Sequence, residues 1–490
     1  MDRKLFEVVV LGGGISGLTA AWCLKKAGVS VRLIEAGRTV GGCTQTQQRD
    51  GFLLEKGPFN VVVRDPTFED LLADLSSDVR VIVADRAANR RYLLRAGRLH
   101  AVPSNPAAML TTPLLGFTSR FRLMGGLVAS KRGTTSEQTI EQAAIRRLGR
   151  EVTDTFVSSA VAGIFSGDIS KLSLQACFPS VAKFDREARS PLLFGLRAAL
   201  RARRNAKSKR PRRWRGLISL DGGLGALTGA LGRRLGDDCM TGRSVESVRR
   251  AKMGFEVTYR STDAGERDGE EIIRARRVVS ALPASHTARI LEPLVPAATA
   301  AIKAIECASL VVLNLGFRRA DVTHDLKGFG FLVPHNELAF PLLGVLWASS
   351  VFPHHACPDH CLFRAFVGGS RDPSAIERLD EDLLAETLKV LRGVLGLRGD
   401  PVLVDICRHR NAIPQYHLGH QKRIAAFKSA LSSTQGLYAI GNYIEGVSIN
   451  GCIRSATNCA SQITRSILND PKRSEPSDSA ESAVCPSQYT

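Results

Sequence analysis

The sequence predicts an α/β protein with more than one domain, and three observations support this fold class. The chain has 490 residues, which is too long for one ordinary hydrophobic core, so two or three domains are expected. Residues 7–42 read as a buried strand, a glycine turn, a helix and a second strand. Residues 436–463 repeat the order of strand, glycine turn and helix near the other end of the chain.

The composition describes a globular protein whose charge favours anionic partners. Hydrophobic residues make up 44% of the chain, and the mean hydropathy is −0.03. No run reaches the roughly 18 apolar residues of a membrane-spanning helix, and we expect no cleaved secretion signal at the glycine-rich N-terminus. Eleven irregularly spaced cysteines indicate a reducing compartment, so we expect the protein in the cytoplasm or on the inner face of the cell membrane. A net charge of +20 favours nucleic acid, acidic lipid or a carboxylate-rich ligand.

The positive charge is concentrated between Leu196 and Arg215, where ten Lys and Arg residues occur without an acidic residue. Three interpretations fit this segment: a solvated loop, a contact with anionic lipid headgroups, or a nucleic-acid patch. The segment has one aromatic residue, Trp214, and no recognisable binding motif, so we expect no nucleic-acid partner. The tail from Pro471 to Thr490 is rich in Ser and Pro, which is typical of disorder.

The N-terminal unit carries a dinucleotide-binding pattern. Val8–Leu11 is a continuous apolar run, and Gly12, Gly14 and Gly17 then form G-x-G-x-x-G. The first glycine allows a tight turn, the second lets a pyrophosphate approach the backbone, and the third lets the helix pack close to the sheet. Glu35 ends the second strand, where a carboxylate accepts hydrogen bonds from ribose hydroxyls.

Two further features narrow the choice of dinucleotide. They are a second glycine pair, Gly41-Gly42, and the segment LLEKGPFN (Leu53–Asn60). The arrangement Glu-x5-Gly-Gly resembles the flavin-containing oxidoreductases of the amine oxidase and phytoene desaturase type. The resemblance implies FAD, bound by a Rossmann-like domain that accompanies a mixed-sheet substrate domain. The glycine pair would follow the pyrophosphate, and the Gly-Pro segment would approach the flavin ring. The cofactor contacts expected here are Gly12, Gly13, Gly14, Ile15, Ser16, Gly17, Glu35, Gly41, Gly42, Cys43, Gly57, Pro58, Phe59 and Asn60.

In these oxidoreductases the flavin domain is assembled from both chain ends and a middle segment. The segment GNYIEGVSINGC (Gly441–Cys452) is expected to lead into a helix from about Ile453, whose N-terminus stabilises negative charge on the ring. A plain strand-turn-helix is the alternative. The contacts that the resemblance implies are Val245 for adenine, through its backbone, and Gly441, Val447, Ser448 and Ile449 for the flavin.

Five shorter motifs identify a narrower resemblance. They are RYLLRAGRLHAVPSNP (Arg91–Pro106), GIFSGDISKLS (Gly163–Ser173), GFGFLVP (Gly328–Pro334), AFVGGSRD (Ala365–Asp372) and AIPQYHLGH (Ala412–His420). All five are characteristic of protoporphyrinogen oxidases and their close relatives, and together they span nearly the whole chain. The sequence therefore resembles an FAD-dependent porphyrinogen oxidase.

The resemblance implies a reaction that depends on positioning. Oxidation of a porphyrinogen removes six electrons in three hydride transfers to the flavin, and O2 then accepts them as H2O2. Hydride transfer needs placement more than an acid-base residue, so no catalytic side chain is expected. Arg91 is expected to bind a propionate through its forked guanidinium, with ordinary surface charge as the alternative. Gly163 is expected to line the pocket, and Leu332, Leu346 and Phe366 to hold pyrrole rings, with ordinary core as their alternative.

The same resemblance divides the chain into segments. The FAD-binding domain would take residues 1–86, 214–292 and 411–470, and the substrate domain would take 87–102 and 293–410. Residues 103–213 would form a helical domain through which relatives attach to membranes, before the tail at 471–490. The expected partners are a porphyrinogen, O2, an anionic membrane surface and a ferrochelatase.

A few residues depart from the pattern of the relatives. Cys43 stands where they often have an aromatic or basic residue, and Gln421 where some have Trp. The loop 354–361 holds three histidines and two cysteines, which could suggest zinc. Their spacing matches no standard site, so we expect a polar turn between two strands and no metal.

Several functions fit this sequence. Oxidation of protoporphyrinogen IX to protoporphyrin IX is the first, and oxidation of coproporphyrinogen III to coproporphyrin III shares the same motifs. The basic residues around Arg91 would suit the four carboxylates of the second substrate. A non-enzymatic relative, such as a prenyl-GTPase chaperone, is disfavoured by the intact glycines at both chain ends. An amine oxidase or desaturase is a further alternative, although no aromatic cage for an amine is evident.

Overall fold

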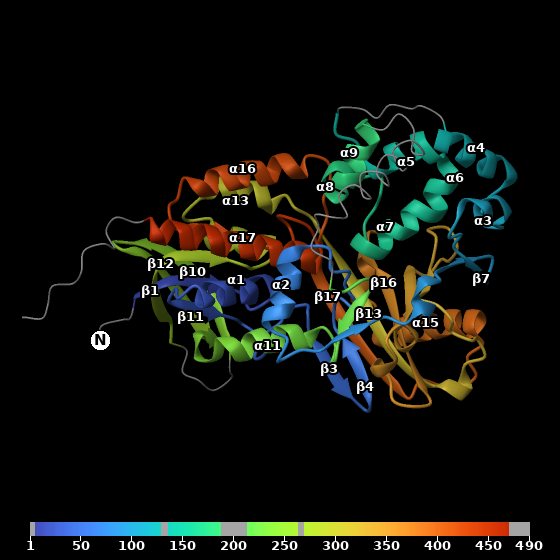
Figure 1. Cartoon of the computed structure of the whole chain (residues 1–490), viewed down its shortest axis with the longest axis horizontal. Coiled ribbons are helices and arrows are strands. Elements are labelled where there is room, and N and C mark those ends of the chain that lie inside the picture. The colour runs from blue at the N-terminus through green and yellow to red at the C-terminus, as the bar shows by residue number, and fades with distance from the viewer. Residues whose placement is uncertain (1–4, 129–135, 188–212, 263–268, 470–490) are drawn as a thin grey trace, which may run out of the picture.

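The computed structural model describes residues 5–128, 136–187, 213–262 and 269–469. The predicted tail and most of the basic segment lie outside these residues. Figure 1 shows two sheet-containing parts side by side, with a helical unit above the second. No helix within the described ranges is both long enough and apolar enough to cross a bilayer.

The first sheet forms the middle layer of an α/β/α domain. Its strands run in the order β10 (Arg243–Ala251), β11 (Gly254–Ser261), β12 (Glu271–Ser280), β1 (Leu5–Leu11), β2 (Val31–Ile34) and β9 (Cys239–Met240), with β18 (Leu437–Ala439) also paired to β12. β1 is parallel to both of its neighbours, as expected for an apolar strand covered on both faces. The helices on one face are α1 (Ile15–Lys26), α2 (Pro66–Asp74), α11 (Gly225–Leu235) and α17 (Ile449–Leu468). The helices on the other are α12 (Ala284–Leu291), α13 (Pro296–Lys303) and α16 (His420–Ser432).

The structure moves some predicted boundaries. α13 lies beyond the expected domain limit at residue 292, yet it buries Ala298 and Ile302 in the core of the first domain. α17 begins at Ile449 rather than near Ile453, because the Ser448 side chain caps the helix by accepting a 3.2 Å hydrogen bond from the backbone N–H of Gly451.

The second sheet faces the first domain. Its strands run in the order β17 (Leu403–Pro414), β13 (Cys307–Arg318), β16 (His360–Gly368), β15 (Leu342–Trp347), β14 (Gly330–Leu332), β6 (Tyr92–Arg95) and β7 (Arg98–Ala101). Only the β14–β6 pair is parallel. α15 (Asp380–Leu395) covers one face, where Leu391 packs with the strand residues Leu313 and Phe363. The opposite face is therefore free to contact the first domain.

Short elements complete the described chain. The helical unit contains α3 (Pro106–Thr111), α4 (Phe117–Val128), α5 (Ile140–Leu148), α6 (Arg150–Val152), a π-helical turn (Thr153–Val157), α7 (Ser158–Phe165), α8 (Leu174–Cys177) and α9 (Pro179–Glu187). Outside it lie α14 (Ala348–Val351) and two small sheets, β3 (Thr46–Arg49) with β4 (Phe52–Glu55) and β5 (Val81–Val83) with β8 (Ile218–Leu220). α7 reaches the second sheet, since a Cβ on Gly163 would lie 3.1 Å from the side chain of Leu332.

Candidate functional site

The first glycine turn has the geometry that a pyrophosphate requires. A Cβ on Gly14 would meet no atom within 4 Å, so this backbone is open to a ligand. A Cβ on Gly17 would instead lie 1.9 Å from the carbonyl oxygen of Gly12, which brings the start of α1 against the turn. Gly12 itself has a φ of +100°, which glycine adopts far more readily than other residues. An open backbone at a helix N-terminus is a suitable place for an anion.

The second glycine pair lies directly against this turn. The backbone N–H of Gly41 donates a 2.8 Å hydrogen bond to the carbonyl oxygen of Gly13. A Cβ on Gly42 would lie 3.3 Å from the Cα atom of Gly14. The structure thus brings together the two segments that were predicted to lie along the same pyrophosphate.

Glu35 and Val245 occupy the neighbouring strand ends. The Glu35 carboxylate accepts hydrogen bonds from the backbone N–H groups of Gly13 (2.5 Å) and Gly37 (2.7 Å). Each carboxylate oxygen has a second lone pair, so the group can still accept ribose hydroxyls. The backbone N–H of Arg243 donates to the carbonyl oxygen of Glu35, which places β10, and with it Val245, beside the predicted ribose site.

The start of α17 meets the N-terminal segments. The Ser16 side chain, in the first turn of α1, lies beside the Cys452 thiol in the first turn of α17. The Asn450 side chain donates to the carbonyl oxygen of Val62 (3.0 Å) and accepts from the backbone N–H of Arg64 (3.1 Å). Sequence analysis missed Asn450, because its partners follow the Gly57–Asn60 segment and lie almost 390 positions away.

These features fit an extended flavin dinucleotide. A second open backbone position occurs at Gly446, where a Cβ would meet no atom within 4 Å. It directly precedes Val447, Ser448 and the start of α17. At one end the site therefore offers the Glu35 carboxylate for a ribose. Open glycine backbone lies beside the N-termini of α1 and α17, and the partial positive charge of α17 is suited to an electron-rich ring at the other end.

The Gly57–Asn60 segment lies between this site and the second sheet. A Cβ on Gly57 would lie 2.1 Å from the carbonyl oxygen of Cys43, so the two predicted cofactor segments touch. Phe59 is buried, while Pro58 and Asn60 are half-buried. The Phe59 ring joins a cluster that also contains Leu346 of the second sheet.

The second sheet brings three predicted substrate residues onto one face. Leu332 on β14 pairs with Gly344, and Gly344 pairs with Phe366 on β16. Side chains two positions apart in a strand share a face, so Leu346, two residues after Gly344, joins them. All three predicted side chains are half-buried, and Gly163 of α7 lies against Leu332. These three side chains therefore form an apolar patch on the face that is not fully covered.

Arg91 lies at the edge of this face. It directly precedes β6, the neighbour of β14, and its side chain is exposed. Its guanidinium carbon is 5.2 Å from the centre of the Phe329 ring, a cation–π contact that orients the charged group. An exposed cation beside an apolar face is suitable for a carboxylate on an apolar ring.

Arg364 is a buried cation on the same face, and sequence analysis missed it. Its Nε donates to Asn314 Oδ1 (3.0 Å), and one terminal nitrogen donates to the carbonyl oxygens of Glu55 (2.7 Å) and Gly57 (3.0 Å). Burial lowers the pKa of Arg364 to about 10, so it is still charged at neutral pH. This arginine joins the second sheet to the segment that was predicted to approach the flavin ring.

Aromatic rings and a carboxyl group surround Arg364. Its guanidinium carbon lies 5.4 Å from the ring centre of Phe59 and 5.5 Å from that of Phe366. The buried Glu55 carboxyl accepts a 2.6 Å hydrogen bond from the backbone N–H of Leu224, and burial raises the pKa of Glu55 to about 7. The only sequence signal for Arg364 was a single arginine two positions before Phe366 in an otherwise apolar strand.

The histidines of the loop 354–361 bond to separate backbone groups. His354 Nε2 lies 3.2 Å from the carbonyl oxygen of Leu220, and His355 Nδ1 lies 3.1 Å from that of Leu53. Burial lowers the pKa of His355 to about 3. Among the described residues there is no group of three or more His, Cys, Asp or Glu side chains arranged to hold a metal ion.

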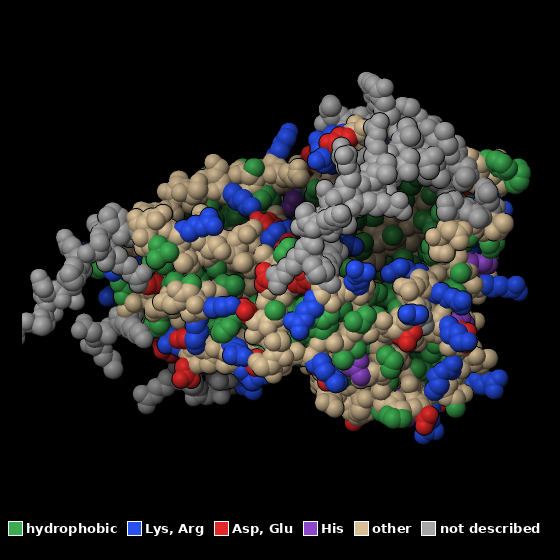
Figure 2. Space-filling model, viewed as in Figure 1, with side chains coloured by type: hydrophobic (Ala, Val, Ile, Leu, Met, Phe, Trp, Pro, Cys, Tyr) green, Lys and Arg blue, Asp and Glu red, His purple; other side chains and the backbone are tan. Residues whose placement is uncertain are grey.

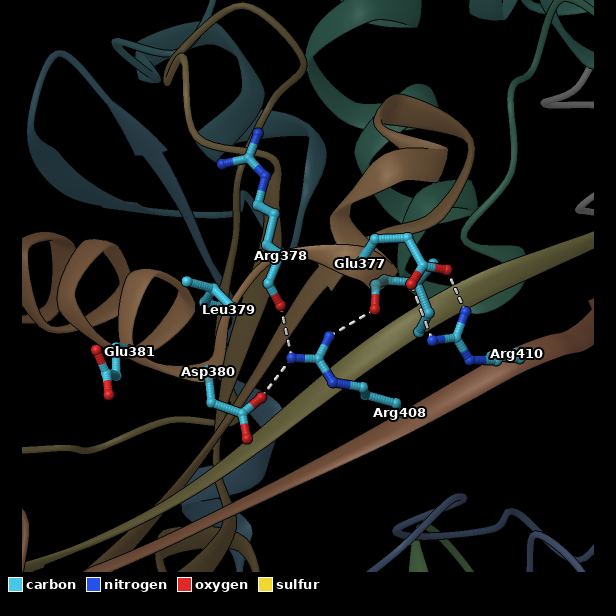
Figure 3. Close-up of a pocket in the computed structure, with 8 residues that line it drawn as sticks. Glu377, Arg378, Leu379, Asp380, Glu381, Arg408 and Arg410 are labelled. Atoms are coloured by element: carbon cyan, nitrogen blue, oxygen red, sulfur yellow. Dashed lines mark hydrogen bonds and ion pairs between the residues drawn. The ribbon is translucent and has the colours of Figure 1, made fainter.

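A surface hollow on the second sheet is separate from this site (Figure 3). Arg408 and Arg410 line it, and both bond to groups in the turn before α15. Arg408 pairs with Asp380 and Arg410 with Glu377, so the charges are largely neutralised within the protein. We therefore assign no ligand to this hollow.

Comparisons with known proteins identify the family of the chain. Residues 15–464 match the family described as Flavin containing amine oxidoreductase. The chain is 31% identical to protoporphyrinogen oxidase of Bos taurus over 489 residues, covering 93% of this chain and 98% of that protein. It is 28% identical to coproporphyrinogen III oxidase of Bacillus subtilis (strain 168) over 466 residues, covering 91% of this chain and 95% of that protein.

Solved structures give the same result for the fold. A putative protoporphyrinogen oxidase from Exiguobacterium sp. 255-15 matches with a TM-score of 0.78 at 24% identity, over 95% of this chain and 100% of that chain. Putrescine oxidase matches with a TM-score of 0.66 at 18% identity, over 94% and 99%. The family match and the relative from Bos taurus confirm an FAD-dependent oxidoreductase and set aside the non-enzymatic alternative. The chain belongs to the protoporphyrinogen and coproporphyrinogen III oxidase family, within the flavin containing amine oxidoreductases.

Proposed function

We propose that this enzyme oxidises protoporphyrinogen IX to protoporphyrin IX in haem biosynthesis. The observation that carries the proposal is the half-buried apolar face of Leu332, Leu346 and Phe366, which adjoins the cofactor segment through Arg364. An apolar macrocycle with carboxylates at its edge would lie on this face with a propionate at Arg91. The names of the relatives support the same substrate class.

The protein's contribution to the reaction is placement. Bound FAD would supply the acceptor for a hydride from a meso carbon of the substrate, the accompanying pyrrole N–H proton would leave to solvent, and O2 would then be reduced to H2O2. Leu332 and Phe366 would hold pyrrole rings, and Gly163, whose lack of a Cβ lets Leu332 approach α7, would line the pocket beside them. The start of α17 would stabilise negative charge at the pyrimidine end of the cofactor. No side chain is required to transfer a proton in this scheme.

Coproporphyrinogen III is the second candidate substrate, because of the basic residues near Arg91. Arg90 and Arg98 are exposed near the same edge and would suit two further propionates, whereas Arg95 is engaged with the carbonyl oxygen of Leu114. The test is an assay of porphyrin fluorescence with protoporphyrinogen IX and coproporphyrinogen III side by side, compared by kcat/KM. A preference for coproporphyrinogen III would contradict the first assignment, and no porphyrin from either, with FAD bound, would contradict both.

Arg91→Ala should raise the KM for the preferred porphyrinogen by tenfold or more and change kcat little. The reason is that a charge-assisted bond to a carboxylate contributes about 1.5–3 kcal/mol, and Arg91 would make it equally in ground and transition states. The matched control is Arg289→Ala, which removes an exposed charge from α12 in the first domain, away from the predicted substrate face. Equal KM values for wild type and Arg91→Ala would exclude Arg91 as the propionate partner.

We further propose that the helical unit docks on an anionic membrane. Phe117 and Phe121 on α4 are 72% and 59% exposed, and their ring centres are 4.7 Å apart. Figure 2 shows hydrophobic side chains protruding at the upper right, where Figure 1 places α4. Arg122 is exposed beside them. Aromatic rings next to a cation are suited to the interface of an acidic bilayer. Such docking would place the enzyme on the predicted inner face of the membrane, where it could transfer its product to a ferrochelatase.

The double variant Phe117→Ser/Phe121→Ser should lose most of its sedimentation with phosphatidylglycerol-containing vesicles. Two exposed rings would otherwise be buried in the acyl boundary, at about 1.5–3 kcal/mol each. Met253→Ser is a control, because Met253 is also 59% exposed but lies on the first domain. Undiminished sedimentation of the double variant would exclude α4 as the docking element.

A further inference from the structure

The segment 415–420 joins the helical unit to the glycine-rich loop 441–446. Gln415 Nε2 donates a 2.9 Å hydrogen bond to the carbonyl oxygen of Phe165, at the end of α7. The backbone N–H of Ser173 donates to the carbonyl oxygen of Tyr416 at 2.8 Å. The side chains of Tyr416 and His420 bond instead to the loop. This segment is part of AIPQYHLGH, which had no structural role assigned to it from the sequence.

The Tyr416 hydroxyl connects the two ends of the loop. It donates a hydrogen bond to the carbonyl oxygen of Asn442 and accepts a 3.0 Å bond from the backbone N–H of Gly446. Gly441 and Gly446 have φ values of +143° and +120°, so the loop uses backbone conformations that do not form part of a regular element. One hydroxyl thus satisfies both a donor and an acceptor of an irregular loop that ends one residue before Val447.

Packing holds the hydroxyl in this position. The Tyr416 ring stacks on His420 with a centroid distance of 4.0 Å and an interplanar angle of 14°, and both side chains are 3% exposed. His420 Nε2 lies 3.0 Å from the carbonyl oxygen of Tyr443, in the middle of the loop. Burial raises the pKa of Tyr416 and lowers that of His420 to about 4, so both rings are neutral near pH 7. Val447 packs in the same cluster as Tyr416 and Phe165.

We propose that Tyr416 is a positioning residue for the flavin. Its hydroxyl closes the loop 441–446 in the conformation that presents Val447 and the N-terminus of α17 to the cofactor. Without the hydroxyl, the Asn442 carbonyl and the Gly446 N–H lose their partner, and the loop relaxes away from the ring. The proposal requires bound FAD but no particular substrate, so its tests contain no porphyrinogen and do not depend on the proposed reaction.

The test is Tyr416→Phe, which removes the hydroxyl and keeps the ring that stacks on His420. The expected result is an FAD dissociation constant about tenfold higher, because two buried backbone groups lose a hydrogen bond. The visible spectrum of the bound flavin should shift, and its midpoint potential should become more negative as the α17 N-terminus moves from the ring. A purely structural role would lower the melting temperature of the apo-protein and leave the spectrum and potential unchanged.

Tyr92→Phe is the matched control. Tyr92 also donates its hydroxyl to a backbone carbonyl, that of Lys327 at 3.1 Å, but it lies on the second sheet away from the loop. FAD affinity, spectrum and potential should be those of the wild type. Wild-type values of all three in Tyr416→Phe would overturn the proposal.

A second measurement covers the case in which Tyr416→Phe does not fold. Hydrogen exchange of the wild-type holoenzyme should show a protected amide at Gly446, because that N–H is bonded to the Tyr416 hydroxyl. Rapid exchange at Gly446, comparable with an exposed loop amide, would show that the loop is not closed and would exclude the positioning role.

Discussion

Gly17→Ala should abolish FAD binding and destabilise the protein by at least about 3 kcal/mol. The added Cβ would lie 1.9 Å from the carbonyl oxygen of Gly12 and 3.2 Å from the side chain of Ala281, so α1 must move away from the sheet. The glycine turn and the first turn of α1 move with it, and both belong to the predicted pyrophosphate site. Flavin absorbance after gel filtration and urea unfolding of the purified protein measure the two effects.

Gly393→Ala is the matched control for this variant. Gly393 lies within α15, and a Cβ there would meet no atom within 4 Å. Replacing an exposed helical glycine by alanine stabilises by about 0.5–1 kcal/mol. A Gly17→Ala protein that retains FAD and wild-type stability would show that the close approach between α1 and the turn does not exist.

Arg364→Met should destabilise the apo-protein by about 3–5 kcal/mol, as expected when a buried charged donor is removed from its partners. Methionine is similar in length and apolar, but it cannot donate to Asn314 or to the carbonyl oxygens of Glu55 and Gly57. Because Gly57 belongs to the predicted flavin contacts, FAD affinity should fall as well. Urea unfolding of the apo-protein and FAD titration measure the two losses.

Arg392→Met provides the comparison for Arg364→Met. Arg392 is paired with Asp400 at 2.6 Å on the surface, with side chains 47% and 85% exposed. Exposed pairs of this kind contribute less than about 1 kcal/mol, so this variant should remain close to the wild type. Similar stabilities of the two variants would contradict a central role for Arg364.

The Arg364→Met variant should also become more sensitive to alkaline pH. Burial already raises the pKa of Glu55 to about 7, and the charge of Arg364 lowers it. The native protein thus already holds the Glu55 proton more tightly than the unfolded chain does, and loss of the Arg364 charge should raise the native pKa of Glu55 further. The free energy of unfolding therefore falls as pH rises from the unfolded pKa through the folded pKa, and this fall should extend to higher pH in the variant.

The predicted cofactor contacts come from patterns that are local in the sequence. The glycine turn at Gly12–Gly17, the pair Gly41-Gly42 and the acid Glu35 were each chosen for their spacing, and the structure places them close together, while their contact with FAD stays a prediction. The start of α17 was misplaced because Gly451 read as a turn residue. In the structure it lies inside the helix, where its N–H bonds to Ser448.

The residues that sequence analysis missed depend on distant partners. Arg364 on β16 bonds to residues more than 300 positions away, and no local pattern distinguishes it from a surface arginine in an edge strand. Asn450 and Tyr416 are similar cases, because the role of each depends on backbone groups that only the fold brings close to its side chain. The predicted substrate face required the strand order of the second sheet, which hydrophobic patterns alone do not specify.

The order of the first sheet has a consequence for synthesis of the chain on the ribosome. β1 pairs with β12, and the ion pair between Glu7 and Arg277 spans 270 positions. A nascent chain therefore carries an apolar strand with an unpaired edge until β12 emerges, and its α1 lacks the covering helix α17 until residue 468 has been made. Unpaired apolar strands are sites of aggregation, so chains stalled before β12 should depend on chaperones. FAD, which needs segments from both ends, can stabilise only chains whose translation has passed α17.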